Sequence, residues 1–156
     1  MPLLRERTEE LFRHLQETIC TGLARADGSA SFAETVWQHA ESGGGRTRIM
    51  TGGALFEKAG VNCSGVATML TERLAERMKL HPQEAFATGL SLVLHPASPM
   101  VPTVHMNLRY FETADGGAWF GGGLDLTPYY LHEEDARHFH RTLKAEVLAG
   151  CSFRDR

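Results

Sequence analysis

TVHMNLRYF, residues 103–111, alternates apolar and polar side chains through most of its length. Successive side chains of a β-strand point to opposite faces, so this alternation predicts a strand with two different faces. One face carries the apolar members, Val104, Met106, Leu108 and Tyr110. The other carries His105, Asn107 and Arg109. The segment therefore predicts a sheet with one face in the core and one face rich in hydrogen-bonding groups.

The preceding segment, Leu90–His95, predicts a second strand, and a loop with three prolines separates the two. If the strands pair across this loop, five polar side chains share one surface: Ser91, His95, His105, Asn107 and Arg109. A solvent-facing sheet surface also alternates in this way, so the pattern by itself is ambiguous. Solvent faces usually favour Thr, Lys and Glu, and the clustered His, Asn and Arg favour a binding surface.

Outward from these strands, the pattern predicts an α+β fold in a single domain, residues 1–156. Amphipathic helices are predicted over residues 4–25 and 66–79, and a third helix from Glu133 onward. Shorter strands are predicted at 32–38, 46–50, 54–62 and 118–121, with glycines 43–45 in a loop.

Composition narrows the class of protein. With 42% hydrophobic and 22% charged residues, the chain is typical of a globular domain. A net charge of −3 without a basic block argues against binding to duplex nucleic acid. No apolar run is long enough to span a bilayer. The cysteines, Cys20, Cys63 and Cys151, form no Cys-x-x-Cys pair, and they favour a reducing compartment, the cytoplasm.

Two further motifs have more than one interpretation. Gly121-Gly122-Gly123 precedes Asp125 and is either a tight turn or a place where a ligand approaches the backbone. Residues 133–140, EEDARHFH, are either a solvated acidic helix start or part of a metal site formed by His95, His105 and His140. The second interpretation would suit a metal-dependent hydrolase, although no His-x-x-x-His or His-Glu-x-x-His spacing supports it.

Longer strings resemble those of a known family. They are GGGRTR (43–48), FEKAGVN (56–62), SLVLHP (91–96), PTVHMNLR (102–109), WFGGGLDLTPYY (119–130) and EEDARHFHRT (133–142). In order and spacing they resemble the oxygen-dependent coproporphyrinogen III oxidase family, from about residue 10 to residue 144. The resemblance implies a large antiparallel sheet flanked by helices, usually in a homodimer.

The resemblance also implies an activity in haem biosynthesis. The family oxidatively decarboxylates two propionates of coproporphyrinogen III to vinyls, which gives protoporphyrinogen IX. Molecular oxygen is the co-substrate and no organic cofactor is required, while a divalent metal has been proposed for some members.

Family roles fall on particular positions of this sequence. The resemblance assigns acid–base and metal roles to His105, and further metal roles to His95 and His140. It assigns substrate contacts to Ser91, Asn107, Leu108 and Arg109, with Arg109 also catalytic. The resemblance implies that Asp125 binds the pyrrole nitrogens of the substrate. From the residues alone, Asp125 could instead pair with Arg109. Arg46 and Arg48 are further candidates for binding propionates.

Family members are roughly twice as long as this sequence, so the resemblance implies a domain that matches their first half. The alternative to an active oxidase is a non-catalytic form that binds porphyrinogen or a full-length subunit. Sheet edges and apolar surfaces that normally face the second half are expected to cause association.

Overall fold

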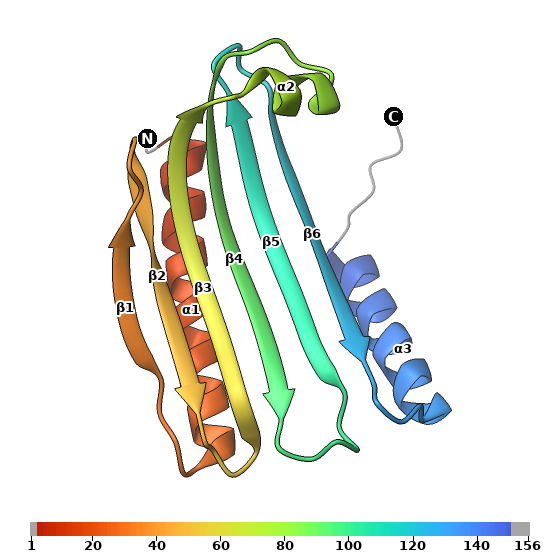
Figure 1. Ribbon diagram of the computed structural model, residues 1–156. Helices are drawn as coiled ribbons and strands as arrows, with labels where there is room; N and C mark the ends of the chain where they lie inside the picture. The colour runs from red at the N-terminus through yellow and green to blue at the C-terminus, as the bar shows by residue number, and fades with distance from the viewer. Residues whose placement is uncertain (1–2, 151–156) are drawn as a thin grey trace.

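A computed structural model describes residues 3–150, and it confirms the α+β prediction. Six strands form one antiparallel sheet in which spatial order follows chain order (Figure 1). The strands are β1 (Ala33–Gln38), β2 (Gly43–Thr51), β3 (Phe56–Met69), β4 (Glu84–Pro96), β5 (Thr103–Thr113) and β6 (Ala118–Thr127). Every connection is therefore between neighbouring strands.

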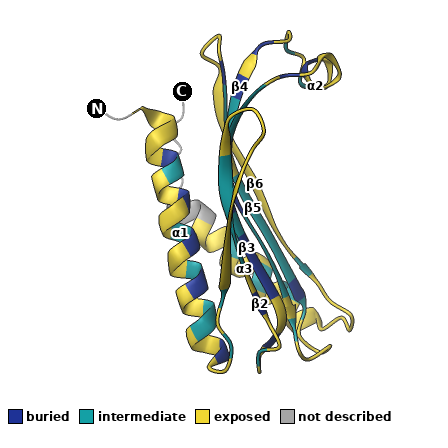
Figure 2. Cartoon of the chain, turned by 60° about the vertical axis from the view of Figure 1, so that its left-hand side comes forward, coloured by how far each residue is buried: buried dark blue, intermediate teal, exposed yellow. Residues whose placement is uncertain are grey.

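Three helices accompany the sheet: α1 (Leu4–Asp27), α2 (Glu72–Met78) and α3 (Glu133–Gly150). Figure 2 shows α1 lying along one face, while α2 leans out on the opposite side at one end of the sheet. Residues of α3 share a pocket with Leu124 and Leu126, whose side chains belong to the α1 face. None of the helices within residues 3–150 has the length and apolar composition needed to cross a membrane.

Three of the predicted element boundaries are wrong. Gly43–Gly45 begin β2 instead of forming a loop, and Gly121–Gly123 lie inside β6 instead of ending it. β3 continues to Met69, so the helix predicted over 66–79 is confined to Glu72–Met78. The cause is pairing between strands: Val66 pairs with both Gly43 of β2 and Ala87 of β4, which outweighs local helix propensity.

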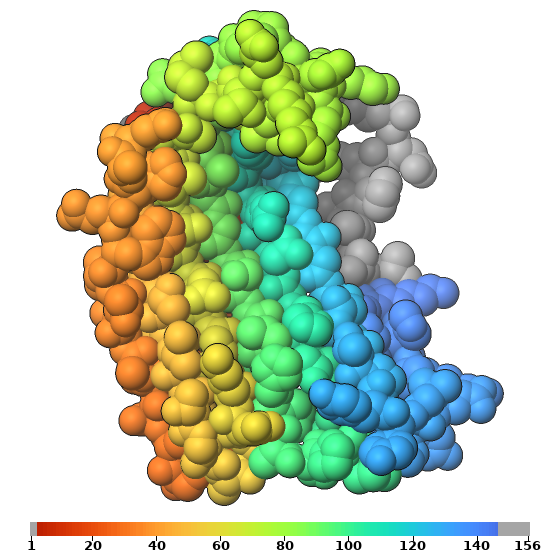
Figure 3. Space-filling model, viewed as in Figure 1, coloured from red at the N-terminus to blue at the C-terminus, as the bar shows by residue number. Residues whose placement is uncertain are grey.

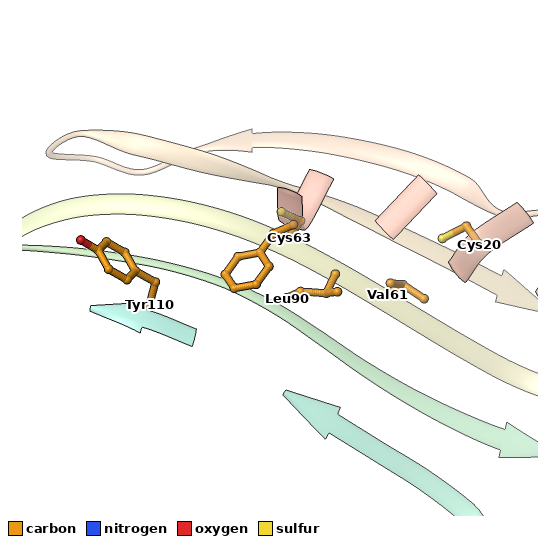
Figure 4. Packing of buried hydrophobic residues seen from close by; sticks show 6 residues of the cluster. Cys20, Val61, Cys63, Leu90 and Tyr110 are labelled. Carbon is orange, nitrogen blue, oxygen red and sulfur yellow. The ribbon is translucent and has the colours of Figure 1, made fainter. Parts of the chain in front are cut away.

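The core lies between α1 and the central strands. Phe12 and Cys20 of α1 pack against Val61, Leu90 and Tyr110 of the sheet, and all five are 0–4% exposed (Figure 4). Tyr110 belongs to the apolar face predicted from alternation. Leu108 and Met106 pack on the same cluster. The sheet is therefore covered by α1 on one face, which leaves the other face available.

A polar cluster fixes α1 to β2 and β3. Gln16 is fully buried, and its amide nitrogen donates to the backbone oxygens of Arg46 and Val61, both at 2.8 Å. Its amide oxygen accepts from Nε of Arg46 at 2.7 Å. Arg48 pairs with Glu17 and Glu34 at 2.8 Å each, and these carboxylates raise its pKa further above the usual value. Both arginines therefore serve α1 docking.

Asp27 joins the end of α1 to the β2–β3 turn. Its carboxylate accepts from the hydroxyl and backbone N–H of Ser29, and from the backbone N–H groups of Ala30, Ala54, Leu55 and Phe56, at 2.7–3.2 Å. These hydrogen bonds, led by that from the Ser29 side chain, hold the pKa of Asp27 well below its ordinary value.

Candidate active site

The face of the sheet opposite α1, here called the open face, carries polar side chains in rows that cross the strands. Strand register determines these rows, because directly paired residues point to the same side. Figure 3 looks onto this face and shows it hollowed beneath α2. Ser91, His95, His105, Asn107 and Arg109 all lie on it, as strand alternation predicts.

The middle row is made of amides and a hydroxyl. Asn62 of β3 pairs with Ser91 of β4, Ser91 pairs with Asn107 of β5, and Asn107 pairs with Gly123 of β6. Asn62, Ser91 and Asn107 are each half-buried. Amide and hydroxyl groups both donate and accept hydrogen bonds, so this row can bind carboxylates or N–H groups of a ligand.

The row on one side of the amides contains a histidine–carboxylate pair. His105 of β5 lies opposite Asp125 of β6, and its Nδ1 is 2.9 Å from Oδ1 of Asp125. Thr127 also donates to that oxygen, at 3.3 Å. An ionised carboxylate only accepts, so Nδ1 of His105 carries the proton and its Nε2 remains for another partner. Asp125 thus pairs with His105 and not with Arg109.

The row on the other side of the amides contains Arg109 between two glycines. Its neighbours are Gly89 of β4 and Gly121 of β6. A Cβ placed on Gly89 would lie 3.5 Å from Cγ of Arg109, so the arginine stem passes over that glycine. Within residues 3–146, Arg109 forms no salt bridge. Its guanidinium is exposed and can take a carboxylate from a ligand.

A pocket of about 590 Å³ opens beside Arg109 and Asn107. Its lining includes the three glycines of β6, the hydroxyl residues Ser64 and Thr88, and an apolar wall. The apolar wall residues come from five elements, α2 and the strands β3 to β6: Val66, Leu74, Met78, Ala87, Phe111 and Trp119. The Phe111 and Trp119 ring centroids are 4.7 Å apart. The pocket thus offers a cation and an amide at one end and hydrocarbon at the other.

The three glycines of β6 have different surroundings. On the α1 face, a Cβ at Gly122 would come within 2.5 Å of the Asn107 backbone oxygen, so strand packing requires glycine there. On the open face, a Cβ at Gly121 would meet nothing within 4 Å, and one at Gly123 would only touch Asn107 Nδ2 at 4.0 Å. The strand itself therefore needs only the middle glycine.

The proposed metal ligands are not brought together. His140 lies on α3 in a pocket with Leu124 and Leu126, on the α1 side of the sheet, whereas His95 and His105 lie on the open face. In the described part of the chain, no three His, Cys, Asp or Glu side chains form a group that could hold a metal ion. Within the described residues, His95, His105 and His140 therefore do not form the ligand set that the metal and hydrolase interpretations require.

Two other expectations change with the structure, and two of the cysteines can be placed. Arg46 and Arg48 are on the α1 face, where they bind Gln16, Glu17 and Glu34, so they cannot join Arg109. Leu108 packs in the core beneath the sheet, so its side chain does not reach the open face. Of the cysteines, Cys20 and Cys63 are free and buried, and burial raises the pKa of both thiols. Cys151 lies outside the described residues.

Several residues of the site were missed from the sequence. Asn62 shares a row with Ser91, and the motif FEKAGVN that contains it could have marked it. Leu74 and Met78 lie in the segment predicted as an amphipathic helix, whose apolar residues usually face a core, and only the tertiary position of α2 shows that they line the pocket. Trp119 is 41% exposed on the open face, although a large aromatic side chain more often lies in a core.

Comparison with known proteins gives one family for most of this chain. The family model described as coproporphyrinogen III oxidase matches residues 7–150. The chain is 49% identical over 139 residues to the oxygen-dependent coproporphyrinogen-III oxidase of Prochlorococcus marinus (strain MIT 9515), which covers 88% of this chain and 40% of that protein. It is 50% identical over 143 residues to the enzyme of the same name from Parasynechococcus marenigrum (strain WH8102), covering 90% and 39%. The chain thus spans about 40% of the length of these relatives.

Proposed function

The chain belongs to the coproporphyrinogen III oxidase family, and we propose that it forms the porphyrinogen-binding face of an oxygen-dependent oxidase. The reaction converts two propionates of coproporphyrinogen III to vinyls. The observation that carries this proposal is the open face: Arg109 and Asn107 line its pocket, and Ser91 and the His105–Asp125 pair lie on the same face in the neighbouring rows.

The proposed substrate has carboxylate groups that suit Arg109 and apolar ring edges that suit the apolar wall of the pocket. Each pyrrole ring of coproporphyrinogen bears one propionate and one methyl group. Arg109 can hold a propionate as a bidentate pair, and Ser91 and Asn107 can complete its hydrogen bonds. The apolar wall of the pocket can cover a methyl-bearing ring edge. His105 and Arg109 are four residues apart, which is about 14 Å along a strand, a span that one macrocycle with its side chains can bridge.

The chemistry removes a carboxylate and two electrons from each propionate. The propionate, O₂ and one proton give a vinyl group, CO₂ and H₂O₂, so atoms and charge balance without a further reductant. Asp125 accepts pyrrole N–H bonds and stabilises positive character on the ring as an electron pair leaves toward oxygen. His105, held through Nδ1, exchanges protons at Nε2. Arg109 orients the carboxylate that is lost as CO₂.

Replacing these residues by alanine is expected to reduce activity to different extents. Asp125→Ala and Arg109→Ala should each lower decarboxylation more than His105→Ala, because water can replace a proton carrier more easily than a fixed charge. General acid–base catalysis typically contributes about 10²–10⁴-fold, which bounds the loss in His105→Ala. Steady-state vinyl formation under oxygen measures the order.

The control for this series is Glu57→Ala, since Glu57 is exposed on β3 and does not line the pocket. Near-normal turnover in Asp125→Ala would contradict the electrostatic role. Porphyrinogen binding without turnover in the unaltered protein would instead support the non-catalytic alternative.

Further assignments follow from the same family membership. We propose a homodimer in the cytoplasm. The dimer is supported by unpaired outer edges of β1 and β6 within the described sheet, and the reducing compartment is supported by the two free, buried thiols.

A further inference from the structure

Helix α2 contributes an apolar edge to the pocket. Leu74 and Met78 are four residues apart, so they lie on one face of the helix, and both line the pocket. Ala75 is 1% exposed and packs with Leu70 and Ala85 in a separate core cluster. Thr71 caps the helix by accepting the N–H of Leu74 at 3.4 Å. The anchored side of α2 thus holds Leu74 and Met78 over the open face.

The facing wall is also apolar. Phe111 and Trp119 stack on β5 and β6, and Val66 and Ala87 extend the surface across β3 and β4. The charged side chains of α2, which are Glu72, Arg73, Glu76 and Arg77, do not line the pocket. Among the described lining residues, the only charged side chain is that of Arg109, at the other end.

We infer that Leu74 and Met78 determine which tetrapyrrole binds, by accepting a methyl-bearing ring edge and rejecting one whose methyls are replaced by carboxymethyl groups. This inference rests on the proposed function. A tetrapyrrole with eight carboxylates would place a charge against Leu74, Met78 and the two aromatic rings. A carboxylate buried there would have no cation, and an unpaired buried charge is strongly unfavourable.

Two unreactive probes test this selection: coproporphyrin, with four carboxylates, and uroporphyrin, with eight. Fluorescence titration of the purified protein is expected to show a preference for coproporphyrin. Leu74→Lys and Met78→Lys each place a cation in the apolar wall, and each should narrow that preference by about tenfold or more. Glu76→Lys adds positive charge to the same helix outside the pocket, and it should leave the ratio of the two affinities unchanged.

Conservative variants keep the inference testable if a lysine disturbs folding, which circular dichroism would show. Leu74→Ala and Met78→Ala should weaken coproporphyrin binding by about tenfold and uroporphyrin binding less. An unchanged affinity ratio in the folded lysine variants, or in the alanine variants, would overturn the inference.

Arg109→Ala separates this inference from the function on which it rests. It should weaken both probes, because each carries propionates. If both probes bind Arg109→Ala as tightly as the unaltered protein, the proposed function fails and the inference fails with it. If Arg109→Ala weakens both while the α2 variants leave their ratio unchanged, only the inference fails.

Discussion

A single carboxylate, Asp27, connects three segments of the chain, and its protonation is expected to weaken the fold. The hydrogen bonds to Ser29, Leu55 and Phe56 favour the charged form and lower its pKa in the folded protein. A depressed folded-state pKa contributes stability above the unfolded value of about 4, and this contribution is lost as pH falls below it. Thermal unfolding measured between neutral pH and pH 2 should show this acid loss.

Asp27→Asn should lower the melting temperature at neutral pH by several degrees. Its melting temperature should also fall less than that of the unaltered protein as the pH is lowered. The amide cannot accept as many N–H groups as the carboxylate. Glu57→Gln is the matched control, since Glu57 is an exposed carboxylate on β3 close to the same turn. If the melting temperatures of the unaltered protein and of Asp27→Asn fall equally with decreasing pH, Asp27 does not titrate as proposed.

Gln16 is a second residue whose loss should be measurable. Removing its side chain in Gln16→Ala leaves two backbone oxygens and Nε of Arg46 without their partner. We expect a loss of about 2 kcal/mol in the free energy of unfolding, because buried polar groups lose their hydrogen bonds. Denaturant titration measures it, with Glu10→Ala, an exposed position of α1, as the control. Equal stability of the two variants would contradict the role of the cluster.

Individual residues also show which parts of the site sequence alone could predict. Period-two alternation placed His105, Asn107 and Arg109 correctly on one face, because register follows directly from strand geometry. Arg46 and Arg48 alternate equally well, but their function depends on α1, which lies far away in sequence. Tertiary packing decides whether a strand's polar face meets solvent, a ligand or a helix. The alternation of side chains gives no information about that packing.

At the level of elements, β6 shows how pairing overrides local propensity. Three consecutive glycines favour a turn, yet Gly121–Gly123 pair along β5 opposite Arg109, Leu108 and Asn107. The same holds for residues 66–69, whose helical pattern is overruled by pairing with β4 and, at Val66, with β2 as well. Local propensity found all six strands and three helices of the described chain, but it could not find how far each strand extends.

The β6 glycines yield a prediction at this scale. Gly122→Ala should destabilise the β5–β6 pairing by about 1–3 kcal/mol, because its Cβ would press against the backbone of Asn107. Gly121→Ala is the matched variant one position away, and its Cβ meets open space. Denaturant unfolding should therefore show that Gly122→Ala is less stable than Gly121→Ala, although both replace glycine by alanine. If both variants are equally stable, close packing does not explain the middle glycine.

The whole molecule exposes large apolar side chains at both sides of the sheet. Val36 on edge strand β1 is 70% exposed, and Phe120 on β6 is 60% exposed. Tyr129 and Leu131, between β6 and α3, are 78% and 77% exposed. Because apolar surface and unpaired strand edges favour association, we expect dimers or larger species at micromolar concentration.

Light scattering coupled to size-exclusion chromatography would measure this association. Val36→Lys and Phe120→Lys should shift the protein toward smaller species, since charge on an edge strand opposes pairing. Lys58→Glu, which alters charge on the interior strand β3, is the control. A monomer at all concentrations in the unaltered protein would contradict the expectation.

The strictly sequential strand order also bears on how the chain acquires its structure. Each strand of the sheet pairs with the strand made immediately before it, and α1, the first helix of the described chain, lies against β3, β4 and β5. No strand has to wait for a distant partner, so loop closure is inexpensive in entropy at every step. During translation, α1 would emerge before the sheet, and each later strand could then pair with the strand that precedes it. The fold can therefore assemble in the direction of translation.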